Sequence, residues 1–72
     1  MMEIKVNDKF ILHATNGTNY RINVININKY REPSMKYACD IWDGDGNYAG
    51  DVSFVGDDFF DIYEEQFERI ED

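Results

Sequence analysis

The chain has 72 residues, 43% of them hydrophobic and 15% aromatic, and a formal net charge of −8. This length predicts one domain over residues 1–72 with a single small core, and this apolar content excludes wholesale disorder. The single cysteine, Cys39, excludes an internal disulfide and is typical of a reducing cytoplasm. No apolar run predicts a signal peptide or a membrane span, so we expect a cytoplasmic location.

Charge is distributed unevenly along the chain. Residues 1–36 carry six Lys and Arg residues against three acids, whereas residues 37–72 carry twelve acids against Arg69 alone. Phosphate repulsion would oppose direct binding of nucleic acid by the second half. An asymmetry this steep favours an acidic face directed at a basic partner. The plainer interpretation is a solvated surface that keeps a small protein soluble.

The first half of the chain predicts antiparallel strands. In EIKVNDKFILHA, two short apolar alternations flank residues 7–8, an Asn-Asp pair that tolerates turn conformations. Residues 16–17, Asn-Gly, are the strongest short hairpin signal in the sequence. We therefore expect a strand on each side of both pairs.

The strand after this hairpin signal has a phase shift. Tyr20, Ile22 and Val24 alternate with polar residues, as in a half-buried strand, but Ile25 then falls on the opposite face. Such a shift predicts a β-bulge or a strand that bends across two sides of a barrel. The segment REPS around Pro33 is predicted to be a loop.

The middle of the chain predicts two more strands joined by residues 43–47. MKYACDIWD alternates as a strand in which Cys39 is a small buried hydrophobe. YAGDVSFV follows the turn, and its Gly50 indicates a bulge or a close backbone approach.

The turn DGDGN at residues 43–47 begins like a calcium-binding loop. The EF-hand pattern needs glycine at its sixth position and glutamate at its twelfth, where this chain has Tyr48 and Phe54. We therefore interpret it as a hairpin turn in which Gly44 and Gly46 adopt positive φ.

From residue 57 the periodicity becomes helical. Phe60, Tyr63, Phe67 and Ile70 are spaced 3, 4 and 3 residues apart, which predicts an amphipathic helix over about residues 57–71. An aspartate at position 57 or 58 would cap its start. The predicted fold is mainly β (α+β), with strands within about residues 3–55. They would form a four- to five-stranded antiparallel SH3-like barrel or curved sheet, followed by this C-terminal helix.

The segment IKVNDKFIL resembles the I-K-V-G-D-x-V opening of small SH3-like barrels, with Asn7 in the glycine position. The resemblance covers about ten residues and favours a barrel over an open sheet. No nucleotide-binding glycine loop is present, and His13 is the only histidine, so a histidine-based zinc site or a catalytic triad lacks its residues. We expect no enzymatic activity, no cofactor and no metal.

The acids of the second half are the candidate partner-binding groups. On the predicted helix, Asp61, Glu65, Glu68 and Asp72 would form one stripe with a step similar to that between phosphates of a DNA strand. Exposed aromatic residues would add the anchors that protein interfaces favour. The candidate residues are Asp40, Asp43, Asp45, Asp51, Asp57, Asp58, Asp61, Glu64, Glu65, Glu68, Trp42 and Tyr48.

In size, acidity and layout the chain resembles the small DNA-mimicking inhibitors that bacteriophages make early in infection. They include inhibitors of the nucleoid protein HU, of uracil-DNA glycosylase and of CRISPR effectors. The likeness rests on charge, length and an Asn- and Ile-rich composition, with no shared motif, so no residue is carried over. It implies a cytoplasmic inhibitor, often a dimer, that binds the DNA-contacting surface of a basic host protein, HU first and a CRISPR effector second.

The alternative is a small SH3-like interaction module of a phage or bacterium. It would recognise a peptide or an assembly partner through its aromatic residues, and its acidity would serve only solubility. Salt separates the two functions, because charge-driven binding weakens with ionic strength and binding in an apolar groove does not.

Overall fold

The computed structural model describes residues 3–70. Five strands, one α-helix and two 3-10 turns make up this part of the chain. They are β1 (Lys9–His13), β2 (Asn19–Ile27), η1 (Pro33–Met35), β3 (Tyr37–Trp42), β4 (Ser53–Val55), α1 (Asp57–Ile62), η2 (Glu64–Gln66) and β5 (Phe67–Ile70).

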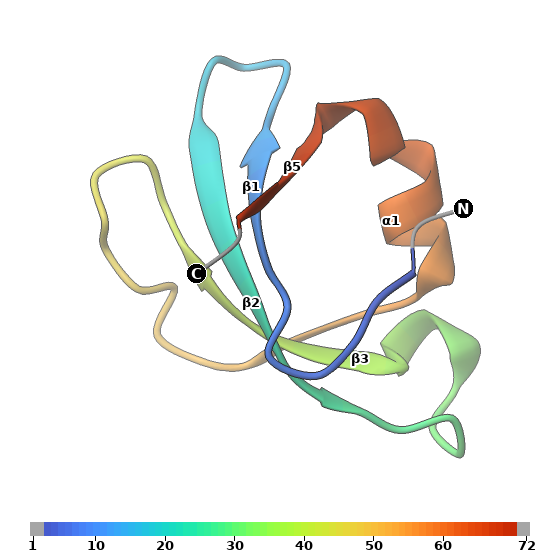
Figure 1. Ribbon diagram of the computed structural model, residues 1–72. Helices are drawn as coiled ribbons and strands as arrows, with labels where there is room; N and C mark the ends of the chain where they lie inside the picture. Colours follow the sequence, from blue (N-terminus) through green and yellow to red (C-terminus); the bar gives the residue numbers. More distant parts are fainter. Residues whose placement is uncertain (1–2, 71–72) are drawn as a thin grey trace.

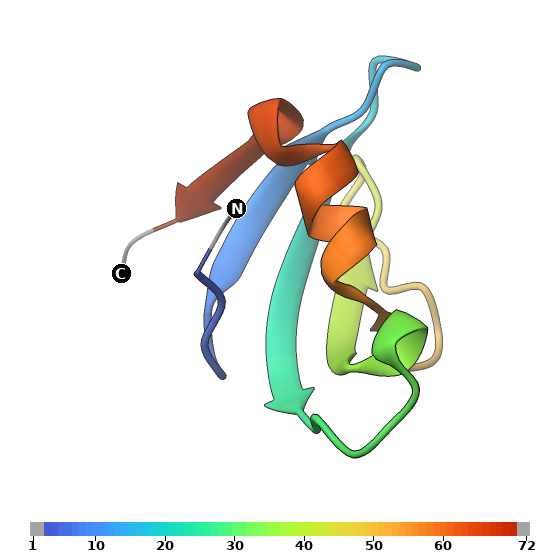
Figure 2. The same ribbon diagram turned by 90° about the vertical axis from the view of Figure 1, so that its right-hand side faces the viewer.

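The strands form one antiparallel sheet in the order β4-β3-β2-β1-β5 (Figure 1). The sheet is curved, and α1 lies across one of its faces (Figure 2). Within residues 3–70 no pairing joins the edge strands β4 and β5, so the sheet stays open. These observations confirm the predicted fold class, a mainly β domain with a curved antiparallel sheet. No helix in the described part of the chain is long and apolar enough to span a membrane.

The turns expected in the first half are present. Between β1 and β2, the Ala14 amide donates to the Thr18 carbonyl oxygen at 3.0 Å, and Gly17 has φ +88°. Asn7 also has positive φ, +75°, as its place in a turn requires. The register of β2 against β3 shifts between Val24 and Asn26. This shift is the predicted bulge, and it leaves the residue between them out of the pairing.

The turn at residues 43–47 is a hairpin turn held by its first aspartate. Asp43 Oδ1 accepts the backbone amides of Asp45 at 2.9 Å and Asn47 at 3.0 Å. Only one of the two glycines expected at positive φ adopts it, Gly46 at +84°. Because the Asp43 carboxylate supplies the local hydrogen bonds, Gly44 stays in an ordinary conformation and that part of the prediction was wrong.

The strand expected after this turn is shorter than predicted. Tyr48 makes only an isolated bridge to Trp42, and regular pairing resumes at β4. Gly50 lies between them with φ +96° and has no atom within 4 Å of a Cβ built on it. Glycine is therefore needed at position 50 for a left-handed backbone conformation, and no close backbone approach occurs there.

The predicted helix over residues 57–71 is wrong beyond Ile62. The chain forms η2 there and then β5, which pairs with β1; position 71 lies outside the described residues. Gly56 is the N-cap of α1, with no side-chain cap, and the two aspartates lie in the first turn. In β5, Phe67 packs on the core while the strand covers the free edge of β1, which a helix could not do.

Aromatic side chains form the centre of the core. The Phe60 ring of α1 lies 5.2 Å from Tyr37 and 5.8 Å from Phe10, centroid to centroid. Phe67 of β5 approaches Phe60 to 5.2 Å. Cys39 is fully buried, and burial raises the pKa of its thiol to about 11, which confirms the prediction of a small buried hydrophobe. The fully or nearly buried side chains are Phe10, Ile22, Val24, Tyr37, Ala38, Cys39 and Phe60.

Candidate functional site

The predicted partner-binding residues lie in two separate regions and on β5. One group lies on β3 and in the loop that follows it: Asp40, Trp42, Asp43, Asp45, Tyr48 and Asp51. The other lies on α1 and η2: Asp57, Asp58, Asp61, Glu64 and Glu65. In Figure 1 the loop of residues 43–52 projects on the left and α1 lies on the right. The acids therefore do not form one continuous row.

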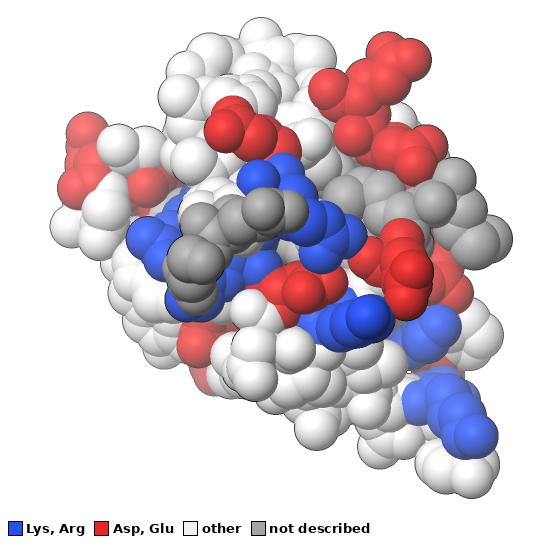
Figure 3. Space-filling model, in the orientation of Figure 1, with Lys and Arg blue, Asp and Glu red and all other residues white. Residues whose placement is uncertain are grey.

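The expected helical stripe of acids is not formed. Asp61 lies in α1, Glu65 in η2 and Glu68 in β5, because the helix ends at Ile62, and Asp72 lies outside the described residues. Figure 3 shows acidic side chains at the left edge and at the upper right, with basic and further acidic side chains interleaved between them. Residues 3–70 therefore contain no row of acidic side chains with the regular spacing of DNA phosphates.

The acids of the β3–β4 region are largely engaged within the fold. Asp40 accepts a hydrogen bond from the Tyr48 hydroxyl at 2.5 Å, and this bond raises the pKa of the tyrosine. The Tyr48 ring lies 5.4 Å from Trp42, so this aromatic pair braces the loop. Amide donation from Asn47 and Asp45 lowers the pKa of Asp43. These groups hold the loop in shape.

Asp57 also has a structural role. The hydroxyl of the buried Tyr37 donates to Asp57 Oδ1 at 2.5 Å, and Lys36 Nζ lies 3.3 Å from Oδ2. The tyrosine hydrogen bond is the main cause that lowers the pKa of Asp57. The first residue of α1 is thereby fixed to β3.

Glu68 on β5 pairs with the only histidine. His13 Nε2 lies 3.0 Å from Glu68 Oε1, and His13 Nδ1 lies 3.0 Å from Asn19 Oδ1. The contact with Glu68, followed by that with Asn19, raises the pKa of His13. This cluster joins the β1–β2 hairpin to β5 and is separate from the acids of α1.

The acids of α1 and η2 form the main exposed acidic surface. We call residues 57–66 the acidic segment; it holds five acids and no base. Among residues 3–70, the side chains of Asp58, Asp61 and Glu65 have no hydrogen-bonding or ionic partner. Ile62 is 72% exposed, and the neighbouring Tyr63 is also exposed. The apolar side chain of Ile62 thus stands in water, and three acids of the same segment, Asp58, Asp61 and Glu65, have no neutralising partner among residues 3–70.

A close backbone approach positions the acidic segment. A Cβ at Gly56 would lie 2.3 Å from the Pro33 carbonyl oxygen and 2.8 Å from the Ser34 Cα. Only glycine permits η1 to pack this closely against the start of α1. Phe60 anchors the same helix in the core, which leaves the acids on the outside.

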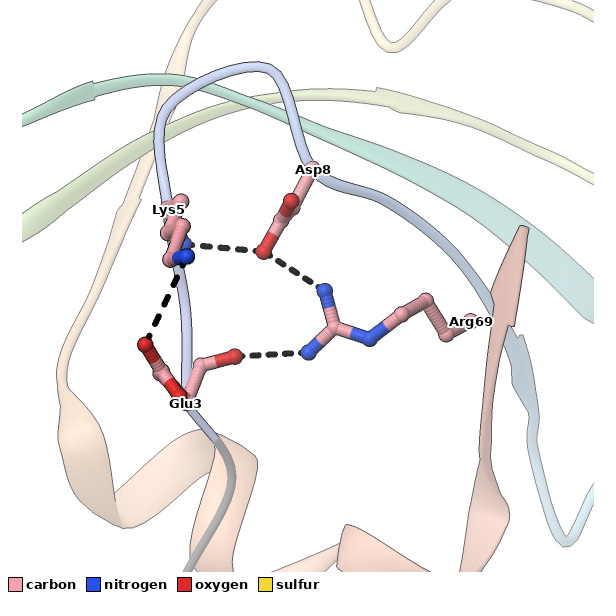
Figure 4. Close-up of polar contacts among 4 residues, drawn as sticks. All are labelled: Glu3, Lys5, Asp8 and Arg69. Atoms are coloured by element: carbon pink, nitrogen blue, oxygen red, sulfur yellow. Dashed lines mark hydrogen bonds and ion pairs between the residues drawn. The ribbon is translucent and has the colours of Figure 1, made fainter. Parts of the chain in front are cut away.

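Arg69 is a structural residue that the sequence interpretation did not single out. Its guanidinium contacts Asp8 Oδ2 and the Glu3 carbonyl oxygen, each at 2.6 Å (Figure 4). It also lies over the buried Phe10 ring, 4.8 Å from the centroid. Burial raises the pKa of Asp8, but its bonds to Arg69 and Lys5 outweigh that effect and lower it. The signal in the sequence was that Arg69 is the only base of the second half.

The described residues contain no cluster of three or more His, Cys, Asp or Glu side chains arranged to hold a metal ion. Comparison with protein families, curated proteins and solved structures found no match to this chain. The geometry therefore supplies the functional argument, and its chemistry is that of an exposed acidic surface with an apolar centre.

Proposed function

We propose that this chain is a non-enzymatic acidic binding protein that blocks a basic nucleic-acid-binding protein. The acidic segment is the contact surface, and the basic groove or patch of the partner is its counterpart. The observation that carries the proposal is the exposure of Ile62 among carboxylates without partners in residues 3–70. Charge attracts and orients the partner, whereas the apolar side chain supplies burial at the centre of the contact.

The exposure of Ile62 favours an interface over a surface that is only solubilising. Acids alone would keep a small protein soluble, and an exposed isoleucine opposes that purpose. Tyr63, next to it, is a residue type enriched in binding hot spots. An apolar centre inside a polar rim is the usual anatomy of a protein interface.

The proposal includes DNA mimicry as its mechanism of inhibition. The acidic segment would occupy Lys and Arg residues that otherwise contact phosphates, and nucleic acid would compete with it. Because the helical row is not formed, the proposal rests on the sign, density and exposure of the charges and not on a copied phosphate spacing. The first candidate partner is the nucleoid protein HU and the second a CRISPR effector, in the cytoplasm of a bacterial host.

A capture experiment with matched variants tests this function. Tagged wild-type protein is compared with D58N/D61N/E64Q/E65Q, which removes four charges from the acidic segment and preserves side-chain size. The control, E3Q/E32Q/D45N/D51N, removes four charges from exposed positions elsewhere. Captured proteins are identified by mass spectrometry at low and moderate salt. We expect wild type and control to capture one basic DNA-binding protein, which salt, duplex DNA and the first variant all abolish.

The proposal is refuted if the two variants capture the same partner equally well, or if duplex DNA in excess leaves the complex intact. Capture lost equally in both variants would show that overall charge, and not the acidic segment, determines binding. An Ile62→Ser variant adds a test of the apolar centre. We expect weaker capture with an unchanged salt dependence, because it removes burial without altering charge.

A second function is favoured by one specific feature. A cleft of about 260 Å³ lies between the β1–β2 turn and the α1–η2 region, with Leu12, Phe59 and Tyr63 among its lining residues. Such a cleft fits one apolar side chain of a peptide, as the interaction-module alternative requires. Leu12→Ser would then weaken capture in a manner insensitive to salt, and the amide variants would have no effect.

A further inference from the structure

The side of the molecule that carries α1 also contains a groove and a basic end. A groove of about 410 Å³ lies between η1 and the start of α1. Pro33 of η1 and Phe54 of β4 contribute to its lining, together with Asp58 and Phe59 of α1. Phe54, in this lining, is 43% exposed, and Phe59 is half-buried. This groove therefore leaves large apolar side chains in contact with water.

Opposite charges flank this groove. We call residues 29–31 the basic end; it contains Lys29 and Arg31 and no acid. Lys29 Nζ lies 5.4 Å from the Tyr30 ring, and the Arg31 guanidinium lies 5.0 Å from the Phe54 ring. Tyr30 is 87% exposed. In Figure 2, α1 lies above η1 and the loop of residues 28–32 lies below it, on the side that faces the viewer.

We propose that a second copy of this chain docks on this face, related to the first by a two-fold axis through the groove. A two-fold interface must be complementary to itself, so each feature of one copy meets a different feature of the other. Here the acidic segment of one copy faces the basic end of its partner, and the same pairing repeats on the other side of the axis. The two grooves meet at the centre and cover the exposed Phe54 together with the half-buried Phe59.

The size of the chain supports a partner at this face. A standard interface buries about 800 Å² per partner, and the chain exposes 4931 Å² in total. The dimer would therefore cover roughly one sixth of this surface. A chain of 72 residues has a small core and gains stability from further burial of apolar surface.

The dimer and the proposed function use the same acidic segment, but the dimer does not depend on that function. A basic partner would compete with the second copy and separate the dimer. Dimerisation would thus hold the acidic segment covered until a better basic surface displaces it. The oligomeric state is measured on the isolated protein. If no dimer is detected, the result of the capture experiment can therefore still be interpreted on its own.

Sedimentation velocity with exchanged charges tests the proposal. K29E/R31E makes the basic end acidic, and D58K/D61K makes part of the acidic segment basic. Each variant alone would place like charges together at both contacts, whereas a mixture of the two restores attraction at both. We expect dimers of the wild type at high micromolar concentration, dimer dissociation constants raised at least about tenfold for each variant, and heterodimers in the mixture.

A matched control separates local contacts from net charge. D45K/D51K changes the net charge as much as D58K/D61K does, but in the loop on the other side of the molecule. We expect it to dimerise at least as well as the wild type, because it reduces the overall repulsion. For every dimer, raising salt from about 0.15 M to 1 M should weaken association, since close ion pairs remain to be screened at the lower value.

A monomeric wild type at every concentration would overturn the proposal, as would two variants that dimerise alone as well as the wild type. Arg31 also donates to Asn26 Oδ1 and the Lys36 carbonyl oxygen, so K29E/R31E is first checked for folding by near-ultraviolet circular dichroism. If that variant is unfolded, K29E alone replaces it in the mixture. Absence of heterodimers with folded partners would place the interface elsewhere and refute this arrangement.

Discussion

Replacing Gly56 with alanine should destabilise the protein through one added methyl group. A Cβ at this position would lie 2.3 Å from the Pro33 carbonyl oxygen and 2.8 Å from the Ser34 Cα. Both atoms belong to the backbone, so no side-chain rotation relieves the contact. The backbone of Gly56, with φ −109° and ψ −178°, is accessible to any residue, and conformational strain plays no part.

The size of the effect follows from this geometry. Ordinary contacts between carbon atoms are about 3.5–4.0 Å, so η1 and α1 must separate by about 1 Å to admit the methyl group. Overpacking of this kind costs about 2–3 kcal/mol. In a domain of this size, that loss lowers Tm by about 10–20 °C. The displacement also moves the acidic segment away from η1, so the variant should weaken partner capture even where it stays folded.

Urea unfolding followed by Trp42 fluorescence measures the stability change. Gly44→Ala is the matched control, since its Cβ would lie 3.4 Å from the Thr18 methyl group and 3.8 Å from the Asn19 nitrogen, both ordinary contact distances, and its φ is not positive. We expect the free energy of unfolding of the control to stay within about 0.5–1 kcal/mol of that of the wild type, which is the usual effect of a Gly→Ala substitution where the backbone conformation suits alanine. Equal stabilities of the two variants would refute the close approach of η1 and α1.

Three further substitutions or measurements test other parts of the structure. Arg69→Met keeps apolar packing but loses the charged hydrogen bond to Asp8, and we expect the free energy of unfolding in urea to fall by about 1–2 kcal/mol. An unchanged urea midpoint would contradict the structural role of Arg69. The buried Cys39 thiol, with its pKa raised to about 11, should react with iodoacetamide only as fast as the protein opens, so rapid labelling of the native protein would contradict its burial. The raised pKa of His13 means that its ion pair with Glu68 stabilises the fold fully below the unfolded pKa of 6.5 and is lost as pH rises through the folded pKa. The stability difference between wild type and Glu68→Gln should therefore shrink from about pH 5 to pH 8, and a pH-independent difference would contradict the pairing.

The sequence predicted those parts of the fold that depend on local patterns. The phase shift after Val24 marked the bulge, and the Asn-Gly pair at residues 16–17 marked the hairpin, because each acts within a few residues. The helix prediction failed where tertiary pairing outweighed periodicity. Phe67 lies at helical spacing from Phe60, yet it reaches the same core from a strand, and β1 gains a partner along its edge. Acids at the C-terminal end of the predicted helix already opposed its dipole.

The acidic surface could be predicted only in outline. The excess of acids in the second half was evident, but their division into structural and exposed groups depends on partners distant in sequence. Asp57 is fixed by Tyr37, twenty residues earlier, and Arg69 reaches Asp8 across the whole chain. Nothing in the local pattern distinguished Asp57 from Asp58, although one anchors α1 and the other has no partner among residues 3–70. The exposure of Ile62 likewise follows from the end of α1, which periodicity placed too late.

The central claim is that the acidic segment is the contact surface for a basic partner. Nuclear magnetic resonance titration of isotope-labelled protein with the captured partner tests it residue by residue. We expect the amide signals of residues 58–65 to shift or broaden, and the change to reverse as salt is raised. Changes centred on the loop of residues 43–52, or changes around Leu12 that persist at high salt, would contradict the claim and assign binding to another surface.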